Sequence, residues 1–486
     1  MNRASAFLLI SFLASDLCSQ AAPLKLPAIF GDNMVLQQQT AVPVWGWAEP
    51  GATVTVRFED QVRRAHADAN GRWRISLGKL KATAVPQTLS VESGVMMTLT
   101  NVLVGEVWLC SGQSNMEKPI PAKWGEQACL NAPQELAAAN YPQIRLFQVE
   151  KVLSATPLDD LKHFRRWREC NSNALDSISF SAAAYFFGRE IHTNLNVPVG
   201  LIESSWGGTM IEPWTPPAGF RMVPSLARLL LLEAATNKIS VVTPSVLYNA
   251  MISPLVGFGI RGALWYQGES NCLGQDDESY SDKMTALVGG WRKLWCEGDF
   301  PFYFVQIAPF KYTGTRPRRS SPEVLPVFWT VQSRAARQIR NAGMAVTTDL
   351  VDDIDNIHPR DKQDVGHRLA LIALNKTYGK RDVVCSGPAF RSVKIEGDKA
   401  VLTFDHADGG LMSKDGRPLS WFTIAGADGK FVRAEAAIVG NAVTVSASGV
   451  DRPAAVRFAW DETAQPNFFN RAGLPCEPFR TDDPLK

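Results

Sequence analysis

The chain has 486 residues, of which 45% are hydrophobic and 20% charged, and its formal net charge is +2. This length exceeds one ordinary hydrophobic core, so two or three folded domains are expected. The composition excludes a disordered or fibrous protein. Acidic and basic residues are interspersed, and this charge distribution predicts no nucleic-acid partner and no insertion into a membrane.

The first 21 residues have the pattern of an export signal. Arg3 supplies a positive start, residues 6–14 form a short apolar run, and Ser19 to Ala21 offer small residues for cleavage. The apolar run is too short to span a bilayer. We therefore expect residues 1–21 to be a signal peptide and the mature protein to be secreted or periplasmic.

Seven cysteines remain after this segment, since Cys18 lies within it. None has the spacing of a metal-ligand set, so we expect no metal site and a structural role for the thiols. An oxidising compartment would permit at most three disulfides among them.

Residues 22–104 show short β-type runs separated by turn signals, the pattern of an antiparallel β-sandwich-like domain. The expected strands include residues 42–45, 53–56, 73–76 and 88–91. No cluster of catalytic residue types occurs there, and we interpret this domain as a scaffold.

Residues 105–385 alternate apolar strands with helical stretches, which predicts an α/β domain with a parallel sheet flanked by helices. The expected strands are residues 107–110, 144–148, 199–203, 262–265, 302–306 and 344–349. The expected helices are residues 181–194, 280–295, 330–340 and 362–375, with a further helical insertion at 220–240. Short strands return over residues 386–486, which predicts a second β domain.

One serine follows the first strand of the α/β domain. The segment from Glu106 to Met116 is an apolar strand, then a glycine turn that presents Ser114 at the carboxyl end of the strand, where open α/β sheets place their ligands. Met116 stands where a G-x-S-x-G elbow would have its second glycine, so that signature is absent. Ser114 is therefore either a nucleophile or the N-cap of the next helix.

A serine nucleophile needs a histidine base that is oriented by a carboxylate. His358 lies between an apolar strand and a helix, three residues after Asp355, a spacing that lets the carboxylate reach the imidazole in a compact turn. His367, within the following helix, is the weaker candidate for the base. The aspartates near His358 could instead cap that helix or bind a cation.

Two further loops follow strands and carry hydrogen-bond donors. One contains Trp206, Gly207 and Gly208, and the other contains Gln267 and Asn271. Backbone N–H groups at glycines and side-chain amides are suitable donors for a developing oxyanion. Four such loops at the ends of strands predict one shared crevice.

At these residues the chain resembles the sialate O-acetylesterase family within the SGNH hydrolases. The resemblance rests on four segments, namely 112–116 (GQSNM), 206–209 (WGGT), 266–271 (YQGESN) and 355–359 (DNIHP). It implies a flavodoxin-like SGNH α/β/α core with a parallel sheet, flanked by N- and C-terminal β-sandwich-like segments.

The resemblance also implies roles for single residues. Ser114 would be the nucleophile, with Asp355 and His358 completing a catalytic triad. The oxyanion donors would be the N–H groups of Ser114 and of Gly207 or Gly208, together with the amide of Gln267 or Asn271. Gln113, Trp206 and Trp265 are the expected substrate contacts, and aromatic rings such as those of Trp206, Trp214 and Trp265 could stack on a sugar.

The expected function is therefore that of a serine esterase, without a cofactor, that removes acetyl groups from sugar hydroxyls through an acetyl-enzyme. An acetylxylan or other polysaccharide acetylesterase is the alternative within enzymes. A non-catalytic carbohydrate-binding protein is the alternative of another class.

Overall fold

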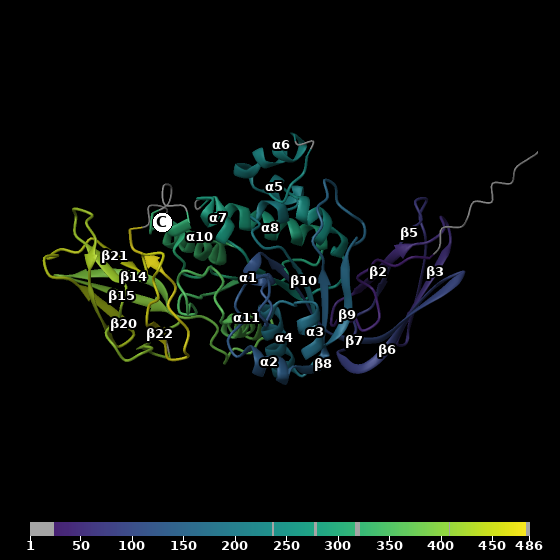
Figure 1. The fold of residues 1–486 in the computed structure, drawn as a ribbon, viewed down its shortest axis with the longest axis horizontal. Coiled ribbons are helices and arrows are strands. Elements are labelled where there is room, and N and C mark those ends of the chain that lie inside the picture. Colours follow the sequence, from purple (N-terminus) through teal and green to yellow (C-terminus); the bar gives the residue numbers. More distant parts are fainter. Residues whose placement is uncertain (1–23, 236–237, 277–278, 316–320, 408, 483–486) are drawn as a thin grey trace, which may run out of the picture.

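The computed structural model describes residues 24–482 except 236–237, 277–278, 316–320 and 408, so the predicted signal peptide lies outside the described residues. Three parts follow one another along the long axis of the molecule (Figure 1): N-terminal strands, a central α/β part and a C-terminal β part. No helix in the described ranges is both long and apolar enough to cross a membrane.

The strand β7 (Val95–Gly112) joins the first two parts without a break. Its first half pairs antiparallel with β6 (Thr83–Ser93), and its second half pairs parallel with β10 (Val199–Ser205) and β11 (Gly262–Tyr266). The expected boundary between residues 104 and 105 thus falls inside one strand. The other N-terminal strands are β1 (Val35–Gln37), β2 (Val42–Trp47), β3 (Thr53–Phe58), β4 (Gln61–His66) and β5 (Arg72–Leu77).

The central sheet is parallel over six strands. Its order is β13-β12-β11-β7-β10-β8, with β9 added antiparallel to β8 at one edge. The remaining strands are β8 (Asn140–Val149), β9 (Phe164–Asn171), β12 (Phe302–Val305) and β13 (Ala342–Ala345). Without β8 and β9 the chain order reads 2-1-3-4-5, as in flavodoxin-like sheets. The α/β core with a parallel sheet is therefore confirmed.

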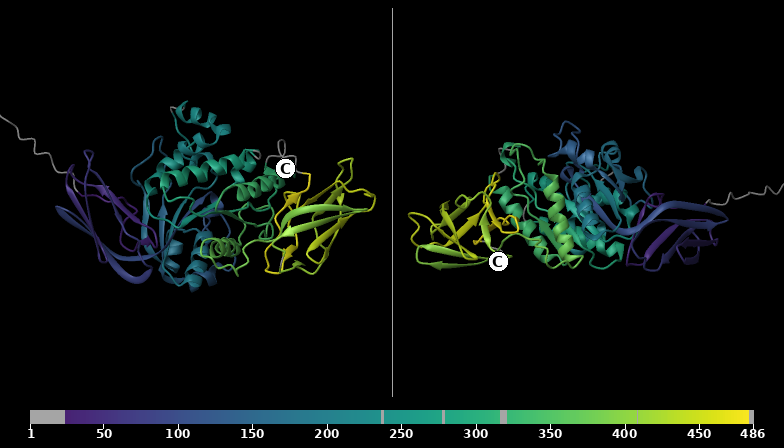
Figure 2. Two further views of the ribbon diagram at one scale, coloured as in Figure 1. Left: turned by 180° about the vertical axis from the view of Figure 1, so that it is seen from behind. Right: turned by 90° about the horizontal axis from the view of Figure 1, so that it is seen from below.

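Helices cover both faces of this sheet (Figures 1 and 2). Trp108 and Cys110 of β7 belong to the apolar cluster that includes α4 (Ala182–Leu195) and α11 (Lys362–Lys376). Val107 and Leu109 belong to the cluster that includes α8 (Tyr280–Trp295) and α10 (Val324–Gln338). This two-residue alternation is what a strand buried on both faces requires. The shorter helices are α1 (Ser114–Glu117), α2 (Ala132–Ala138), α3 (Ser172–Ser177), α5 (Pro217–Met222), α6 (Arg228–Ala235), α7 (Glu269–Leu273) and α9 (Tyr312–Thr315).

Two expected boundaries were wrong. The helix α10 begins at Val324 rather than Thr330, because Pro326 lies in its first turn, where the missing N–H costs no helical hydrogen bond. The strand β13 ends at Ala345 rather than Asp349. Beyond it the Val346 carbonyl accepts a hydrogen bond from Arg368, which takes the backbone out of the ladder.

The C-terminal part is wholly antiparallel, as expected. A cluster of phenylalanine rings fills its interior, including Phe404, Phe422, Phe458, Phe468 and Phe479. Its strands are β14 (Ala389–Glu396), β15 (Lys399–Asp405), β16 (Leu411–Ser413), β17 (Phe422–Ala425), β18 (Val432–Arg433), β19 (Glu435–Val439), β20 (Ala442–Ser446), β21 (Ala455–Phe458), β22 (Phe468–Asn470) and β23 (Phe479–Arg480).

Six of the cysteines in the described ranges take no part in the disulfides that the sequence would permit. Free thiols are present at Cys110, Cys129, Cys170, Cys296, Cys385 and Cys476. Four of these six side chains are buried, as is usual for cysteine that packs as a small apolar residue.

Candidate active site

The nucleophile turn depends on a glycine. Gly112 ends β7 with φ +144°, and a Cβ there would lie 2.1 Å from the carbonyl oxygen of Tyr266 on the neighbouring strand. The next residue, Gln113, donates its backbone N–H to that same oxygen at 2.9 Å. Only glycine permits this close approach. The turn therefore brings Ser114 to the carboxyl edge of the sheet, beside the end of β11.

Ser114 contacts a histidine and does not cap the next helix. It is the first residue of α1, whose N-cap is Gln113. Its Oγ lies 2.8 Å from Nε2 of His358, which belongs to the loop before α11. The alternative in which Ser114 caps the helix was therefore wrong.

A carboxylate from a third segment holds the other side of the imidazole. Nδ1 of His358 lies 3.0 Å from Oε1 of Glu126, in the loop between α1 and α2. Because a carboxylate accepts hydrogen bonds, the contact favours the tautomer with the proton on Nδ1. Nε2 is then free to accept the Ser114 proton. Ser114, His358 and Glu126 thus have the arrangement of a serine hydrolase triad.

The prediction that Asp355 orients His358 does not match this geometry. The Asp355 carboxylate forms an ion pair with Lys311 at 2.8 Å, and its side chain is 68% exposed. The three-residue spacing brought it close in sequence, but the loop turns its side chain toward solvent. Glu126 was missed because it lies 232 residues from His358 in a loop without a recognisable motif.

Burial and neighbouring cations set the basicity of His358. Burial lowers its pKa below the ordinary value of 6.5, Glu126 opposes this effect, and the ammonium groups of Lys362 and Lys118 lower the pKa further. The imidazole is therefore unprotonated at neutral pH, as a general base must be. His367 instead pairs with Glu190 at 3.5 Å, which raises its pKa, and we find no contact between it and Ser114 among the described residues.

Of the two glycines in the second loop, Gly207 adjoins Ser114. A Cβ on Gly207 would lie 3.2 Å from Cβ of Ser114, whereas one on Gly208 would meet nothing within 4 Å. The N–H of Gly207 already donates to Oε2 of Glu117 at 2.7 Å. Glu117 also pairs with Lys151, which offsets its charge beside the site. Gly207 is therefore the glycine nearer to Ser114, and its N–H would have to leave Glu117 to serve an oxyanion.

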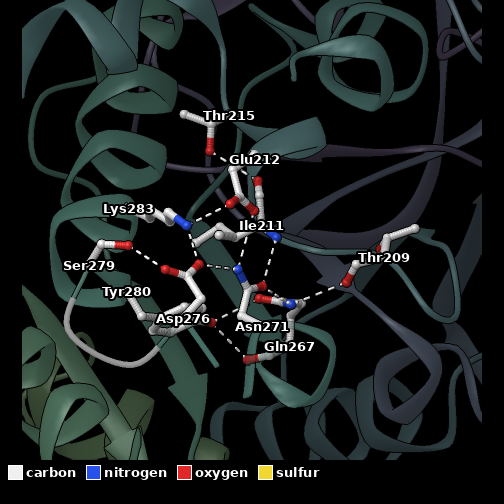
Figure 3. Close-up of polar contacts among 10 residues, drawn as sticks. All are labelled: Thr209, Ile211, Glu212, Thr215, Gln267, Asn271, Asp276, Ser279, Tyr280 and Lys283. Atoms are coloured by element: carbon white, nitrogen blue, oxygen red, sulfur yellow. Dashed lines mark hydrogen bonds and ion pairs between the residues drawn. The ribbon is translucent and has the colours of Figure 1, made fainter. Parts of the chain in front are cut away.

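The two amides of the third loop are engaged elsewhere (Figure 3). Nδ2 of Asn271 donates to Glu212 at 3.2 Å and to Asp276 at 2.9 Å. Nε2 of Gln267 has acceptors on Asn271 at 2.7 Å and on Thr209 at 3.1 Å. Both side chains are fully buried. Their hydrogens already have partners, so neither amide has a free donor for an oxyanion in this structure.

This buried network connects the second and third loops. Lys283 of α8 donates to Glu212 at 2.6 Å and also contacts Asp276, so that one ammonium serves two carboxylates. Asn271 accepts the backbone N–H of Ile211 at 3.1 Å. The network thereby fixes the loop that carries Gly207 against the start of α7.

Gln113 has the free amide that the third loop lacks. Its Oε1 accepts hydrogen bonds from Gln267 Nε2 at 3.1 Å, Gly268 N at 3.3 Å and Ser270 N at 3.2 Å. Its Nε2 has no hydrogen-bond partner in the described part of the chain and is not among the fully buried polar atoms. The side chain is thus anchored by its oxygen, and its nitrogen remains available one residue before the nucleophile.

A small pocket adjoins the catalytic pair. It encloses about 40 Å³, and its walls include Ser114 and His358 together with Pro119, Pro121 and Trp124. The pocket therefore admits only a small group beside the nucleophile.

The tryptophans expected to bind substrate differ in position. Trp206 is partly exposed, with the Lys151 ammonium 5.9 Å from its ring and the same distance from the ring of Trp124. Trp265 and Trp214 are fully buried and pack edge to face with centroids 6.2 Å apart. The prediction of Trp265 as a substrate contact was wrong, because its strand position faces the core beneath α8.

Comparisons with known proteins show that the chain is similar to carbohydrate esterases. Residues 104–375 match the family model described as carbohydrate esterase, sialic acid-specific acetylesterase. The chain is 31% identical over 421 residues to human sialate O-acetylesterase, covering 79% of this chain and 76% of that protein. It is 30% identical over 445 residues to the mouse sialate O-acetylesterase, covering 78% of each.

A solved structure has the same fold over nearly the whole chain. It is a crystal structure of a novel carbohydrate acetylesterase from Xanthomonas citri, with TM-score 0.85 and 36% identity, and the match covers 95% of this chain and 100% of that one. The chain therefore belongs to the sialic acid-specific acetylesterase family of carbohydrate esterases, and it is an esterase that hydrolyses O-acetyl esters on sugars.

Proposed function

We propose that Ser114, His358 and Glu126 perform the ester hydrolysis as a catalytic triad. The observation that carries the proposal is the chain of contacts from Ser114 Oγ to His358 Nε2 at 2.8 Å and from His358 Nδ1 to Glu126 at 3.0 Å. His358 takes the proton as Oγ attacks the acetyl carbonyl, then gives it to the departing sugar oxygen. Water activated by the same imidazole releases acetate from the acetyl-enzyme.

Three donors serve the oxyanion in this proposal. The Ser114 N–H lies in the first turn of α1 and has no helical acceptor. The Gly207 N–H turns partly from Glu117 toward the oxyanion, and the amide of Gln113 supplies the side-chain donor. The anchored oxygen of Gln113 supports this role, because a donor fixed before the reaction stabilises the transition state without reorganisation.

The pocket beside Ser114 accommodates the acetyl methyl group. Pro119, Pro121 and Trp124 form its apolar walls, and a volume of about 40 Å³ favours a short acyl group over a long one. The sugar then lies on the outer side of the ester, where the partly exposed Trp206 offers a ring for stacking. Gln113 acts on the acyl oxygen rather than on the sugar.

Acetylated sialic acid is the first substrate to test, because the family model and the mammalian relatives are named for it. Acetylated xylan is the alternative within the same chemistry. The export signal proposed for residues 1–21 would place the enzyme outside the cytoplasm, where such glycans occur.

The test is acetate release from p-nitrophenyl acetate, O-acetylated sialic acid and acetylated xylan. Ser114→Ala and His358→Ala should each lower kcat about 10⁴-fold or more, because both residues act in one chemical step. The relative kcat/KM values rank the natural substrates. Wild-type rates in either variant would contradict the proposed triad.

A further inference from the structure

A buried ammonium group lies behind the catalytic pair. Lys362 is the first residue of α11, and its side chain is fully buried. Its Nζ donates to Oδ1 of Asn115 at 2.8 Å and to the carbonyl oxygen of Pro359 at 2.6 Å. Asn115 directly follows Ser114, and Pro359 directly follows His358. One ammonium therefore connects the two catalytic segments next to their reacting residues.

Asn115 makes the complementary connection. Its Nδ2 donates to the carbonyl oxygen of Ile357 at 3.0 Å and to Oε1 of Glu269 at 2.5 Å. The carbonyls on either side of His358, those of Ile357 and Pro359, are thus both held by buried donors. Glu269 opens α7, so the third loop is joined to the same point.

We propose that Lys362 and Asn115 form a buried clamp that fixes His358 against Ser114, and that the charge of Lys362 extends the activity of the enzyme to lower pH. Both are positioning residues, since neither touches the reacting atoms. The proposal rests on the proposed roles of Ser114 and His358, and it goes beyond them by assigning a function to a charge outside the triad.

A purely structural role explains this lysine poorly. Burying an ammonium costs free energy that an apolar side chain would not incur, and the burial lowers the pKa of Lys362 to about 8. Within the described part of the chain, its Nζ donates to one amide oxygen and one carbonyl oxygen and to no carboxylate, and it lies 5.4 Å from the centre of the Tyr266 ring. Charge-assisted hydrogen bonds are stronger than neutral ones, so the arrangement gains rigidity at the two positions that matter for proton transfer.

The charged groups around His358 fix the sign of the pH effect. Glu126 raises the pKa of His358, whereas Lys362 and Lys118 lower it in addition to burial. The groups that face Lys362 are Cys129, Lys118, Glu269 and Asp361. Removing the positive charge of Lys362 must therefore raise the pKa of His358. Because the base has to be unprotonated, the acid limb of the pH profile then moves to higher pH.

The experiment separates charge from hydrogen bonding with four variants of the full chain. Lys362→Gln removes the charge but keeps two donor hydrogens, Lys362→Met removes both, Lys362→Arg keeps the charge, and Asn115→Ala removes the other arm of the clamp. The readouts are kcat and KM with p-nitrophenyl acetate and the pH dependence of kcat/KM. Circular dichroism and Tm report folding.

We expect the acid limb to move to higher pH in Lys362→Gln and Lys362→Met, and to stay in place in Lys362→Arg and Asn115→Ala. Lys362→Met and Asn115→Ala should also lose about tenfold or more in kcat with little change in KM, because proton transfer depends on geometry. If Lys362→Met does not fold, Lys362→Gln still tests the charge and Asn115→Ala still tests the clamp.

An acid limb that is unmoved in Lys362→Gln would overturn the electrostatic role, and an unchanged kcat in Asn115→Ala would overturn the clamp. The Ser114→Ala variant keeps this outcome distinct from failure of the proposed function. If Ser114→Ala is inactive while the Lys362 and Asn115 variants behave as wild type, only the clamp is wrong. If Ser114→Ala remains active, the triad itself is wrong.

Discussion

Two polar clusters lie at the same edge of the central sheet, and they differ in how far their hydrogen bonds are satisfied. The catalytic cluster of Ser114, His358 and Glu126 is partly open, with 18% of the His358 side chain and 34% of the Glu126 side chain exposed. The network of Gln267, Asn271 and the Lys283 ion pairs is nearly closed to solvent, and its donors all have acceptors. We conclude that the first cluster can still bind a substrate atom, whereas the second stabilises loops.

Residues of the sequence motifs differ in role: some are positioned to act on the substrate, and others stabilise the loops. Gln113 and Gln267 are both conspicuous amides that lie after strands, and they contact one another at 3.1 Å. The amide nitrogen of Gln267 donates its hydrogens within the network. Gln113 is held by its amide oxygen, and its amide nitrogen remains available. These two residues have the same side chain, so what distinguishes the proposed oxyanion donor from the loop-stabilising residue is whether its amide nitrogen has a free hydrogen near Ser114.

The largest expected effect concerns the carboxylate on His358. Glu126→Gln should lower kcat about 10²- to 10⁴-fold, because the imidazole loses the partner that fixes its tautomer and stabilises the imidazolium. Asp355→Asn should change kcat less than about threefold, since its carboxylate contacts Lys311. Steady-state kinetics with p-nitrophenyl acetate decide between them. A large loss in Asp355→Asn alone would assign the role back to Asp355.

Glu126→Gln should also change the pH dependence of the reaction. Glu126 raises the pKa of His358, so its neutralisation should lower that pKa further and move the acid limb of kcat/KM to lower pH. This shift is opposite in sign to the one expected for loss of the Lys362 charge. Profiles of both variants, measured with one substrate, therefore test whether the two groups act on His358 from opposite sides.

The donor assigned to the oxyanion should give the next largest effect. Gln113→Ala should lower kcat about 10²- to 10³-fold, because a preorganised oxyanion donor contributes mainly in the transition state. Its Tm should fall only by the amount expected for truncating a buried polar side chain. KM should stay unchanged while kcat falls. Wild-type kcat in Gln113→Ala would show that the Gln113 amide does not serve the oxyanion.

The closed network should respond in stability. Lys283→Met leaves Glu212 and Asp276 without their shared cation and should lower the free energy of unfolding by about 3 kcal/mol, the lower end for a buried pair, because those side chains are 13% and 20% exposed. Lys293→Met, on the exposed side of the same helix, should change it by less than about 0.5 kcal/mol. Urea denaturation measures both, and equal values would show that the network does not stabilise the fold.

Sequence reasoning located the strands and the turn that carries Ser114 well because these are local signals. The apolar run before Ser114 and the glycine turn at Gly112 specify the strand, its end and the exposed serine within a few residues. His358 was identifiable because few histidines are present and one follows a strand at the edge where ligands bind. The parallel sheet followed from the alternation of strands and helices.

The errors arose where long-range packing decides the outcome. Asp355 has the right spacing, but Glu126 reaches the imidazole from a loop 232 residues away. Gln267 and Asn271 have the right residue type, but Asp276, Glu212 and Lys283 occupy their polar atoms. Trp265 lies next to a motif, yet its face of the strand points into the core. No local pattern reports which partner a side chain finds after folding.

The smallest expected effect concerns the choice of acyl group. Trp124 is 64% exposed and lies at the pocket beside Ser114, so Trp124→Ala should open that pocket and raise the ratio of butyrate to acetate hydrolysis about tenfold, in the range that one or two methylene groups contribute to discrimination. Trp421→Ala, which removes a partly exposed indole in the C-terminal β part, is the matched control and should leave the ratio unchanged. The measurement is kcat/KM for p-nitrophenyl acetate, butyrate and hexanoate. An unchanged ratio in Trp124→Ala, with lower activity on acetylated sugars, would instead place the indole on the sugar side of the ester, and the small pocket would then select the leaving group rather than the acyl chain.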